Sequence, residues 1–149
     1  HFRSGGVDPG RDGCRVPLPW TAEGPSLGFG PDGAAAPWLP QPMSWGSVSV
    51  AAQEGDPASM LSLYRAALAH RRSDVDLRGE ALEWIDAGAD VIAFRRGDGL
   101  VSITNLGTAP VALPPHSGVH LASAPLAGGL LPPDSTAWLA VEPPSGESA

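Results

Sequence analysis

Cysteine is nearly absent from the sequence. Cys14 is the single cysteine, so no disulfide can form within the chain. Long apolar runs are absent too, because no stretch approaches the roughly 18 apolar residues that a transmembrane helix needs. A single cysteine fits a reducing compartment, and we expect a cytoplasmic protein.

Positive charge is also scarce. The sequence holds nine Lys+Arg against 16 Asp+Glu, which gives a net charge of −7. An acidic chain repels the phosphate backbone, so we expect no nucleic-acid partner. The basic residues form no run longer than the pairs at 71–72 and 95–96, so we expect no membrane-binding patch either.

Proline and glycine, by contrast, are abundant and unevenly placed. The sequence holds 17 prolines and 19 glycines. Those in the first 57 residues interrupt most of that stretch, which predicts a long irregular segment. A short extended stretch at 47–51 is the one regular element expected in it. The segment also carries large aromatic residues, among them Trp20, Phe29, Trp38 and Trp45. Such side chains favour burial, so we expect the segment to pack against another part of a longer protein. A sequence that begins with His1 instead of Met agrees with that expectation.

A helix is predicted over residues 57–72. Asp56 is a suitable N-cap, and Pro57 fits the first turn of a helix. Apolar residues then follow helical spacing, at positions 60, 61, 64, 67 and 68. His70 and the two arginines after it place positive charge at the negative end of the helix dipole.

Beyond residue 73 the spacing of apolar residues changes from that typical of a helix to the alternation typical of strands. Gly97-Asp98-Gly99 is a turn sequence suited to positive φ, and the strands on either side of it predict a β-hairpin. Short strands with Gly/Pro turns between them predict an all-β sandwich. The expected strands cover residues 81–85, 90–96, 100–105, 110–113, 118–123 and 135–141.

Catalytic acids are not evident. Hydrolysis of a glycosidic bond needs two carboxyl groups that face one sugar. Asp8 with Asp12 and Glu80 with Glu83 are close in sequence, but neither pair lies in a context that would separate their two pKa values. We interpret all four as turn or surface residues and predict no catalytic residue in this chain.

Metal ligands and nucleophiles are not predicted either. His116 and His120 have the spacing of two ligands on a helix. Pro114, Pro115 and Gly118 forbid a helix there. Cys14 has no histidine or cysteine partner at catalytic spacing, so we interpret it as a small buried apolar residue. We therefore expect neither a metal site nor a cofactor.

One polar block remains, from Arg11 to Trp20. Arg11 and Arg15 flank Asp12 in a loop stiffened by proline. The planar guanidinium group can bridge two acceptors, such as adjacent sugar hydroxyls or a carboxylate. Trp20 adds a flat apolar face. From the residue types alone, a sugar-binding loop and a structural Arg–Asp clamp are equally supported.

This block resembles a segment of the α-glucosidases and oligo-1,6-glucosidases of the α-amylase family. They carry the form Arg-Asp-x-x-Arg-Thr-Pro-Met-Gln-Trp after the last strand of their (β/α)8 barrel. The matching residues are Arg11, Asp12, Arg15, Pro17 and Trp20, while Val16, Leu18 and Pro19 depart from that form and resemble an actinobacterial type.

The resemblance extends along the chain. Residues 45–54 are similar to the connector before the final barrel helix, residues 56–65 to that helix, and residues 74–149 to the family's C-terminal β-domain. It implies the C-terminal part of a barrel enzyme, in which residues 1–73 end the barrel (last βα loop and final helix) and residues 74–149 form an antiparallel β-sandwich domain.

The resemblance also implies a function for the intact protein. It would hydrolyse terminal α-glucosidic bonds of malto- or isomalto-oligosaccharides with retention, using three acids that precede this chain. Arg15 would bind the terminal glucose, while Arg11, Asp12 and Trp20 would brace the loop. Without the missing barrel, the isolated chain would be inactive.

Two alternatives stay open. A transglycosylase or isomerase of the same family, such as trehalose synthase, would use the same loop. A β-sandwich module without catalytic activity, which binds carbohydrate or protein, would account for the C-terminal strands alone.

Overall fold

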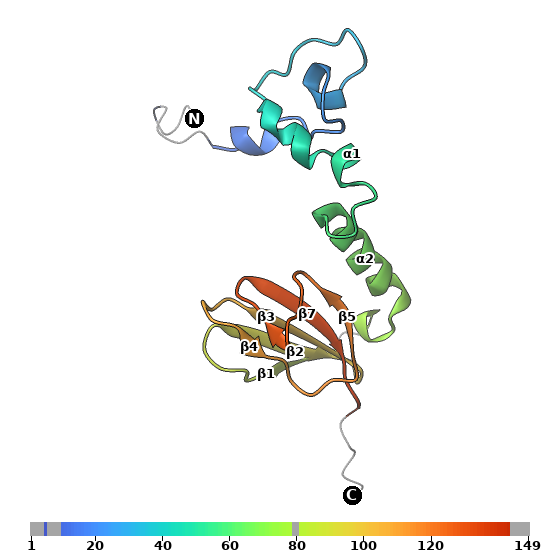
Figure 1. Ribbon diagram of the computed structural model, residues 1–149, viewed down its shortest axis with the longest axis vertical. Helices are drawn as coiled ribbons and strands as arrows, with labels where there is room; N and C mark the ends of the chain where they lie inside the picture. Colours follow the sequence, from blue (N-terminus) through green and yellow to red (C-terminus); the bar gives the residue numbers. More distant parts are fainter. Residues whose placement is uncertain (1–4, 6–9, 79–80, 144–149) are drawn as a thin grey trace, which may run out of the picture. The chain divides into compact units, whose positions relative to one another are not determined.

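The computed structural model describes residue 5, residues 10–78 and residues 81–143 (Figure 1). Asp8 and Glu80, two of the acids considered above, lie outside these ranges. The chain forms two compact units, residues 1–62 and residues 63–149. The second unit thus includes most of the long helix as well as the strands. The assignment of residues 1–73 to a barrel stays a prediction.

The first unit is built from short helices joined by irregular chain. They are η2 (Asp12–Arg15), η3 (Pro25–Gly28), η4 (Met43–Val48) and α1 (Val50–Gln53). The extended stretch expected at 47–51 is wrong. Ser49 accepts a hydrogen bond from Ala52 N at 3.3 Å and so caps α1, which turns these residues into a helix start.

The long helix α2 spans Met60–Ser73 and was predicted at 57–72. It begins later because Asp56 caps a separate turn, where its Oδ1 accepts from Ala58 N at 2.9 Å. Ser59 is the residue that precedes the helix, and its hydroxyl accepts from Ser62 N at 3.2 Å. Both Ser and Asp are good N-caps, so the sequence alone could not decide between them.

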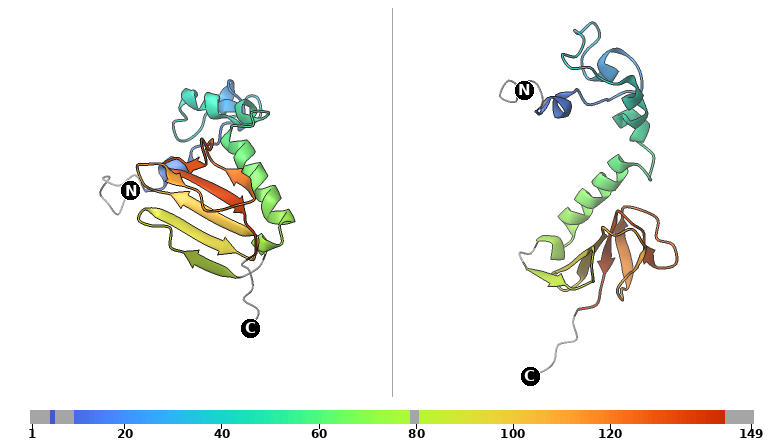
Figure 2. Two further views of the ribbon diagram at one scale, coloured as in Figure 1. Left: turned by 60° about the horizontal axis from the view of Figure 1, so that its bottom comes forward. Right: turned by 90° about the vertical axis from the view of Figure 1, so that its left-hand side faces the viewer.

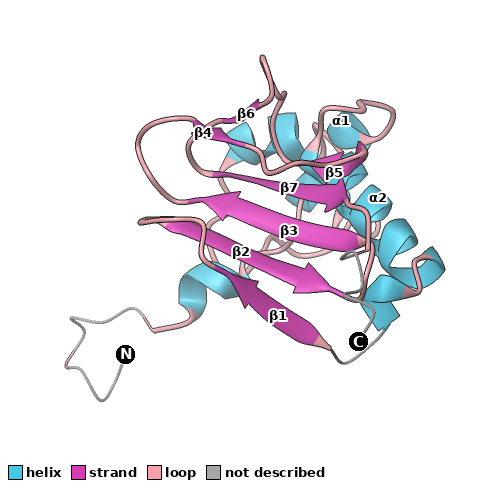
Figure 3. Cartoon of the chain, turned by 90° about the horizontal axis from the view of Figure 1, so that it is seen from below, coloured by secondary structure: helices cyan, strands magenta, loops and turns pink. Residues whose placement is uncertain are grey.

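The strands form an antiparallel β-domain, as the sequence predicted. The main sheet has five strands in the order β1-β2-β3-β7-β5 (Figure 3). A second sheet pairs β4 with β6. The bounds are β1 Leu82–Ile85, β2 Val91–Arg96, β3 Leu100–Asn105, β4 Val111–Ala112, β5 Gly118–Ala122, β6 Leu130–Leu131 and β7 Ser135–Ala140.

The two faces of the main sheet are covered differently. One face carries the hydrophobic core, to which the small sheet contributes Leu131; the core consists of Ala93, Val101, Ile103, Leu131, Ala137 and Leu139. The opposite face is covered at its β7–β5 side by α2, as the left view of Figure 2 shows. There Leu63 and Ala67 of the helix line one hollow together with Leu121 and Trp138 of the sheet.

Asn105 ties the two sheets together at the end of β3. Its side chain is fully buried, and its Nδ2 donates to Leu131 O at 3.1 Å and to Ala109 O at 2.9 Å. Its Oδ1 accepts from Gly107 N at 2.9 Å. A buried amide satisfied in this way fixes the turn after β3 and the position of β6.

The β2–β3 hairpin is held by an acid from outside it. Asp76, in the short helix η5 (Asp76–Arg78), accepts from Gly99 N at 3.1 Å and from Asp98 N at 3.3 Å. Gly97 has a φ of +56°, and a Cβ there would collide with the Asp76 carboxylate. Glycine is thus required at this position by both φ and close approach.

We expect Asp76→Ala to lower the free energy of unfolding by about 1–2 kcal/mol, because two hydrogen bonds to a half-buried carboxylate are lost. Urea unfolding measures the change. Asp98→Ala is the matched control, since it removes an exposed acid from the same turn and leaves both bonds in place. Equal losses in the two variants would contradict this role of Asp76.

Among the described residues, no helix combines the length and the apolar character required to cross a membrane.

Candidate functional site

The Arg11–Trp20 block begins with the exposed helix η2. The side chains of Arg15 and Asp12 are 67% and 52% exposed, and Arg15 Nη1 lies 3.9 Å from Asp12 Oδ1. An exposed ion pair at that distance contributes little to stability. Cys14 is also exposed, so its interpretation as a buried apolar residue is wrong; its thiol donates to Arg11 O at 3.0 Å. The structure therefore presents both Arg15 and Asp12 to solvent.

The chain after Arg15 is anchored at several points. Gln41 Nε2 donates to Pro17 O at 2.9 Å. Val50 N and Ala51 N, at the start of α1, donate to Pro19 O and Trp20 O at 3.1 and 3.0 Å. Arg15 thus lies at the end of a segment held by hydrogen bonds and stiffened by two prolines.

Trp20 belongs to a set of exposed aromatic side chains in the first unit. Trp20 N donates to the carbonyl of Leu27 at 2.8 Å, and Leu27 is fully buried. The indole itself is 48% exposed, Phe29 is 56% exposed and Trp38 is 98% exposed. Within this unit Trp20, Phe29 and Trp38 therefore do not find the burial that such side chains favour, whereas Trp45 is half-buried.

The described residues provide no buried acid. The buried polar side chains among them are Ser49, Ser59, Ser102, Asn105 and Ser135, with no Asp or Glu. A general acid in a glycosidase needs an environment that raises its pKa, commonly an apolar one. Asp12 and Glu83 are both exposed, so neither is enclosed by apolar side chains in the described part of the chain.

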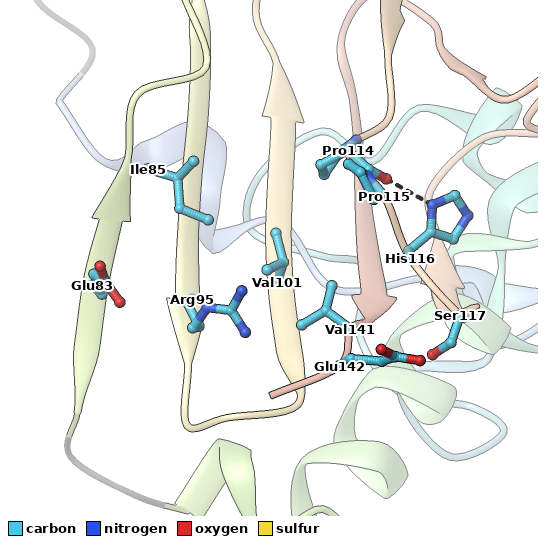
Figure 4. A pocket seen from close by; sticks show the side chains of 10 residues that line it. All are labelled: Glu83, Ile85, Arg95, Val101, Pro114, Pro115, His116, Ser117, Val141 and Glu142. Carbon is cyan, nitrogen blue, oxygen red and sulfur yellow. Dashed lines mark hydrogen bonds between the residues drawn. The ribbon is translucent and has the colours of Figure 1, made fainter. Parts of the chain in front are cut away.

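The β-domain has an open hollow of about 670 Å³ on its core-facing side (Figure 4). Arg95 reaches into it from β2, between Glu83 on one side and Glu142 on the other. Arg95 Nη1 donates to Asp98 O at 2.9 Å, and His116 Nδ1 lies 2.8 Å from Pro114 O. These two polar groups bond to neighbouring backbone, so they do not converge on a common point where a ligand would bind.

Sequence comparison relates the β-domain, and a stretch of 90 residues of the chain, to known proteins. Residues 77–138 match a family described as a domain of unknown function (DUF3459). The chain is 41% identical over 90 residues to a "Probable alpha-glucosidase" of Rhizobium meliloti (strain 1021). That match covers 60% of this chain and 16% of the relative.

Solved structures give matches that extend over most of the chain. An alpha-glucosyl transfer enzyme, XgtA, is 31% identical with a TM-score of 0.68, over 89% of this chain and 26% of that one. The trehalulose synthase MUTB is 25% identical with a TM-score of 0.71, over 88% and 26%. The isomaltulose synthase of Klebsiella sp. LX3, at 20% identity and a TM-score of 0.74 over 93% and 29%, shares the fold. The chain thus spans about a quarter of the length of these enzymes.

Proposed function

Because this chain is related by sequence and by fold to the α-glucosidases and glucosyl-transfer enzymes of the α-amylase family, we propose that the complete protein hydrolyses terminal α-glucosidic bonds of small oligosaccharides with retention. The observation that carries the proposal is the 41% identity to a protein named as an alpha-glucosidase. The catalytic acids would come from a barrel outside this chain. We also propose a cytoplasmic location, for which the single cysteine is the support.

The exposed apolar side chains of the chain support the proposal that a barrel outside this chain packs against it. Met60, Tyr64 and Leu68 follow one another at four-residue spacing on α2 and are 59%, 64% and 46% exposed. Residues at this spacing share one helix face. Within the first unit, Trp20, Phe29 and Trp38 are exposed as well. Large exposed apolar patches mark interaction sites, so we propose that residues 1–73 complete the barrel and residues 74–149 form the domain that follows it.

Arg15 is the residue of this chain that we propose to contact substrate. Its guanidinium group is exposed and only weakly engaged by Asp12. The anchored backbone after it limits the entropy lost on binding. A guanidinium group can bridge two hydroxyls of the terminal glucose. Arg11, Asp12 and Trp20 would keep the loop in place.

The test is an assay of the complete protein with p-nitrophenyl α-D-glucopyranoside. We expect release of nitrophenol and, by NMR at early times, α-glucose as the first anomer, because retention preserves the configuration. The isolated chain of 149 residues should release none. Release of β-glucose first would contradict retention, and turnover by the isolated chain would contradict the placement of the acids outside it.

Transfer or isomerisation of a glucosyl group is a second candidate. It is favoured by the similarity to the alpha-glucosyl transfer enzyme at 31% identity and to the trehalulose synthase at 25%. Incubation with maltose separates the two functions. A hydrolase yields glucose alone, whereas a transferase or isomerase yields a new disaccharide or a longer oligosaccharide.

A further inference from the structure

Two histidines and an aspartate from separate elements meet in the second unit. His70 lies in the last turn of α2, Asp74 directly follows the helix, and His120 belongs to β5. The two imidazole rings are 4.4 Å apart between centroids. One ligand atom from each of the three side chains lies within 4.8 Å of the others. We propose that His70, Asp74 and His120 bind a divalent transition-metal ion, of which Zn²⁺ is the best match.

The geometry of His70 is the first support. Its Nε2 atom is buried and lies 3.1 Å from Asp74 Oδ2, yet the two atoms are not aligned as a hydrogen bond. A hydrogen bond requires the N–H to point at its acceptor. Two ligands of one cation instead point at a common position between them. The separation is close to the distance of about 3.3 Å between ligand atoms that tetrahedral zinc, with bonds of about 2.0–2.1 Å, requires.

Asp74 is held in place by bonds that leave one oxygen for a metal. Its Oδ1 accepts from Asp76 N at 2.9 Å, and its own N donates to His70 O at 2.9 Å. The side chain is only 15% exposed. Because Oδ1 is occupied, Oδ2 is the atom that faces His70, and an oriented carboxylate of this kind is typical of metal ligands.

His120 is brought to the cluster by an irregularity in β5. Val119 pairs with Leu139 and Leu121 pairs with Trp138, so His120 is the extra residue of a β-bulge. A bulge re-aims the side chain at that position, and bulges are frequent beside functional sites. The ring of Trp138 lies 6.0 Å from that of His70 and provides an apolar side to the cluster.

The donor set selects the class of metal. Two imidazole nitrogens and one carboxylate oxygen suit Zn²⁺ with a water molecule as fourth ligand. Mg²⁺ and Ca²⁺ prefer oxygen ligands and do not match two histidines. A metal here would link the C-terminal end of α2 to β5. The sequence predicted no metal site, because His116 and His120 cannot share a helix and nothing in the sequence shows that His70 lies beside His120.

Calorimetric titration of the chelator-treated complete protein with ZnCl₂ tests the proposal. We expect one Zn²⁺ site that is weakened at least about tenfold in His120→Ala and unchanged in His116→Ala. His116 is a matched control, since it is an exposed histidine four residues away and outside the cluster. His120 is also exposed, so its replacement leaves the fold intact. His70→Ala should weaken the site to a similar extent.

Co²⁺ supplies a readout that does not depend on stability. We expect the strong visible absorption of tetrahedral Co²⁺ in the wild-type protein and in His116→Ala, and its loss in His120→Ala. The proposal is overturned if wild-type protein, His116→Ala and His120→Ala bind Zn²⁺ equally, or if none of them binds it. In either case the His70–Asp74 pair would serve only to stabilise the end of α2.

Discussion

Arg15→Ala in the complete protein is expected to lower kcat/KM for a small α-glucoside about ten- to hundredfold. The estimate follows from the loss of one charge-assisted hydrogen-bonding group in a closed site, which costs about 1.5–3 kcal/mol. Stability should change little, because Arg15 is 67% exposed and its contact with Asp12 is 3.9 Å long. Steady-state kinetics with the nitrophenyl glucoside, together with thermal unfolding of both proteins, measure the two effects.

Two further variants distinguish direct contact of Arg15 with the substrate from a role in bracing the loop. Arg15→Lys keeps the charge but loses the planar fork, so we expect a smaller but clear loss. Arg11→Ala removes the other exposed arginine of the block and should have a much weaker effect. Wild-type kinetics in Arg15→Ala would exclude Arg15 as a substrate ligand. Equal losses in Arg11→Ala and Arg15→Ala would indicate that both arginines only brace the loop.

Leu131→Ala is expected to lower the free energy of unfolding of the β-domain by about 2–5 kcal/mol. Leu131 is fully buried and is the residue of β6 in the core formed with the main sheet. Its truncation leaves a cavity between two β-layers, and such a site can collapse only partly. Urea unfolding followed by tryptophan fluorescence measures the loss.

The adjacent residue provides the matched control. Leu130 has the same side chain on the same strand but is 42% exposed, because successive residues of a strand point to opposite faces. We expect Leu130→Ala to cost less than about 1 kcal/mol. Similar losses for the two leucines would mean that β6 does not pack on the main sheet as described.

The secondary structure was largely predictable because its signals are local. The turn at 97–99 and the apolar alternation on either side of it predicted the β2–β3 hairpin. The start of α2 was misplaced because Asp56 and Ser59 are both good N-caps. The strand order was not predictable, since the pairing of β7 with both β3 and β5 depends on contacts between residues far apart in the chain.

The two candidate sites also differ in whether their residues are close together in sequence. Arg15 could be singled out because its block is contiguous in sequence and resembles a segment of the α-glucosidases, although its substrate contact stays a prediction. The His70–Asp74–His120 cluster could not be predicted from the sequence. Only His70 and Asp74, four residues apart, are close in sequence, and His120 is far from both. The bulge that places His120 beside them has no sequence signal of its own.

The position of β7 in the sheet affects how the chain is made. A ribosome delivers β1, β2 and β3 in the order in which they pair, so this part of the sheet can assemble as the polypeptide emerges. β5 is the next strand of this sheet to emerge, but its partner in the sheet is β7, the last of the described strands in the order of the chain. Until β7 has left the ribosome, β3 and β5 both present unpaired edges, which are the surfaces most prone to aggregation. Synthesis of this protein therefore includes an interval, from β5 to β7, in which the nascent chain most needs protection by a chaperone.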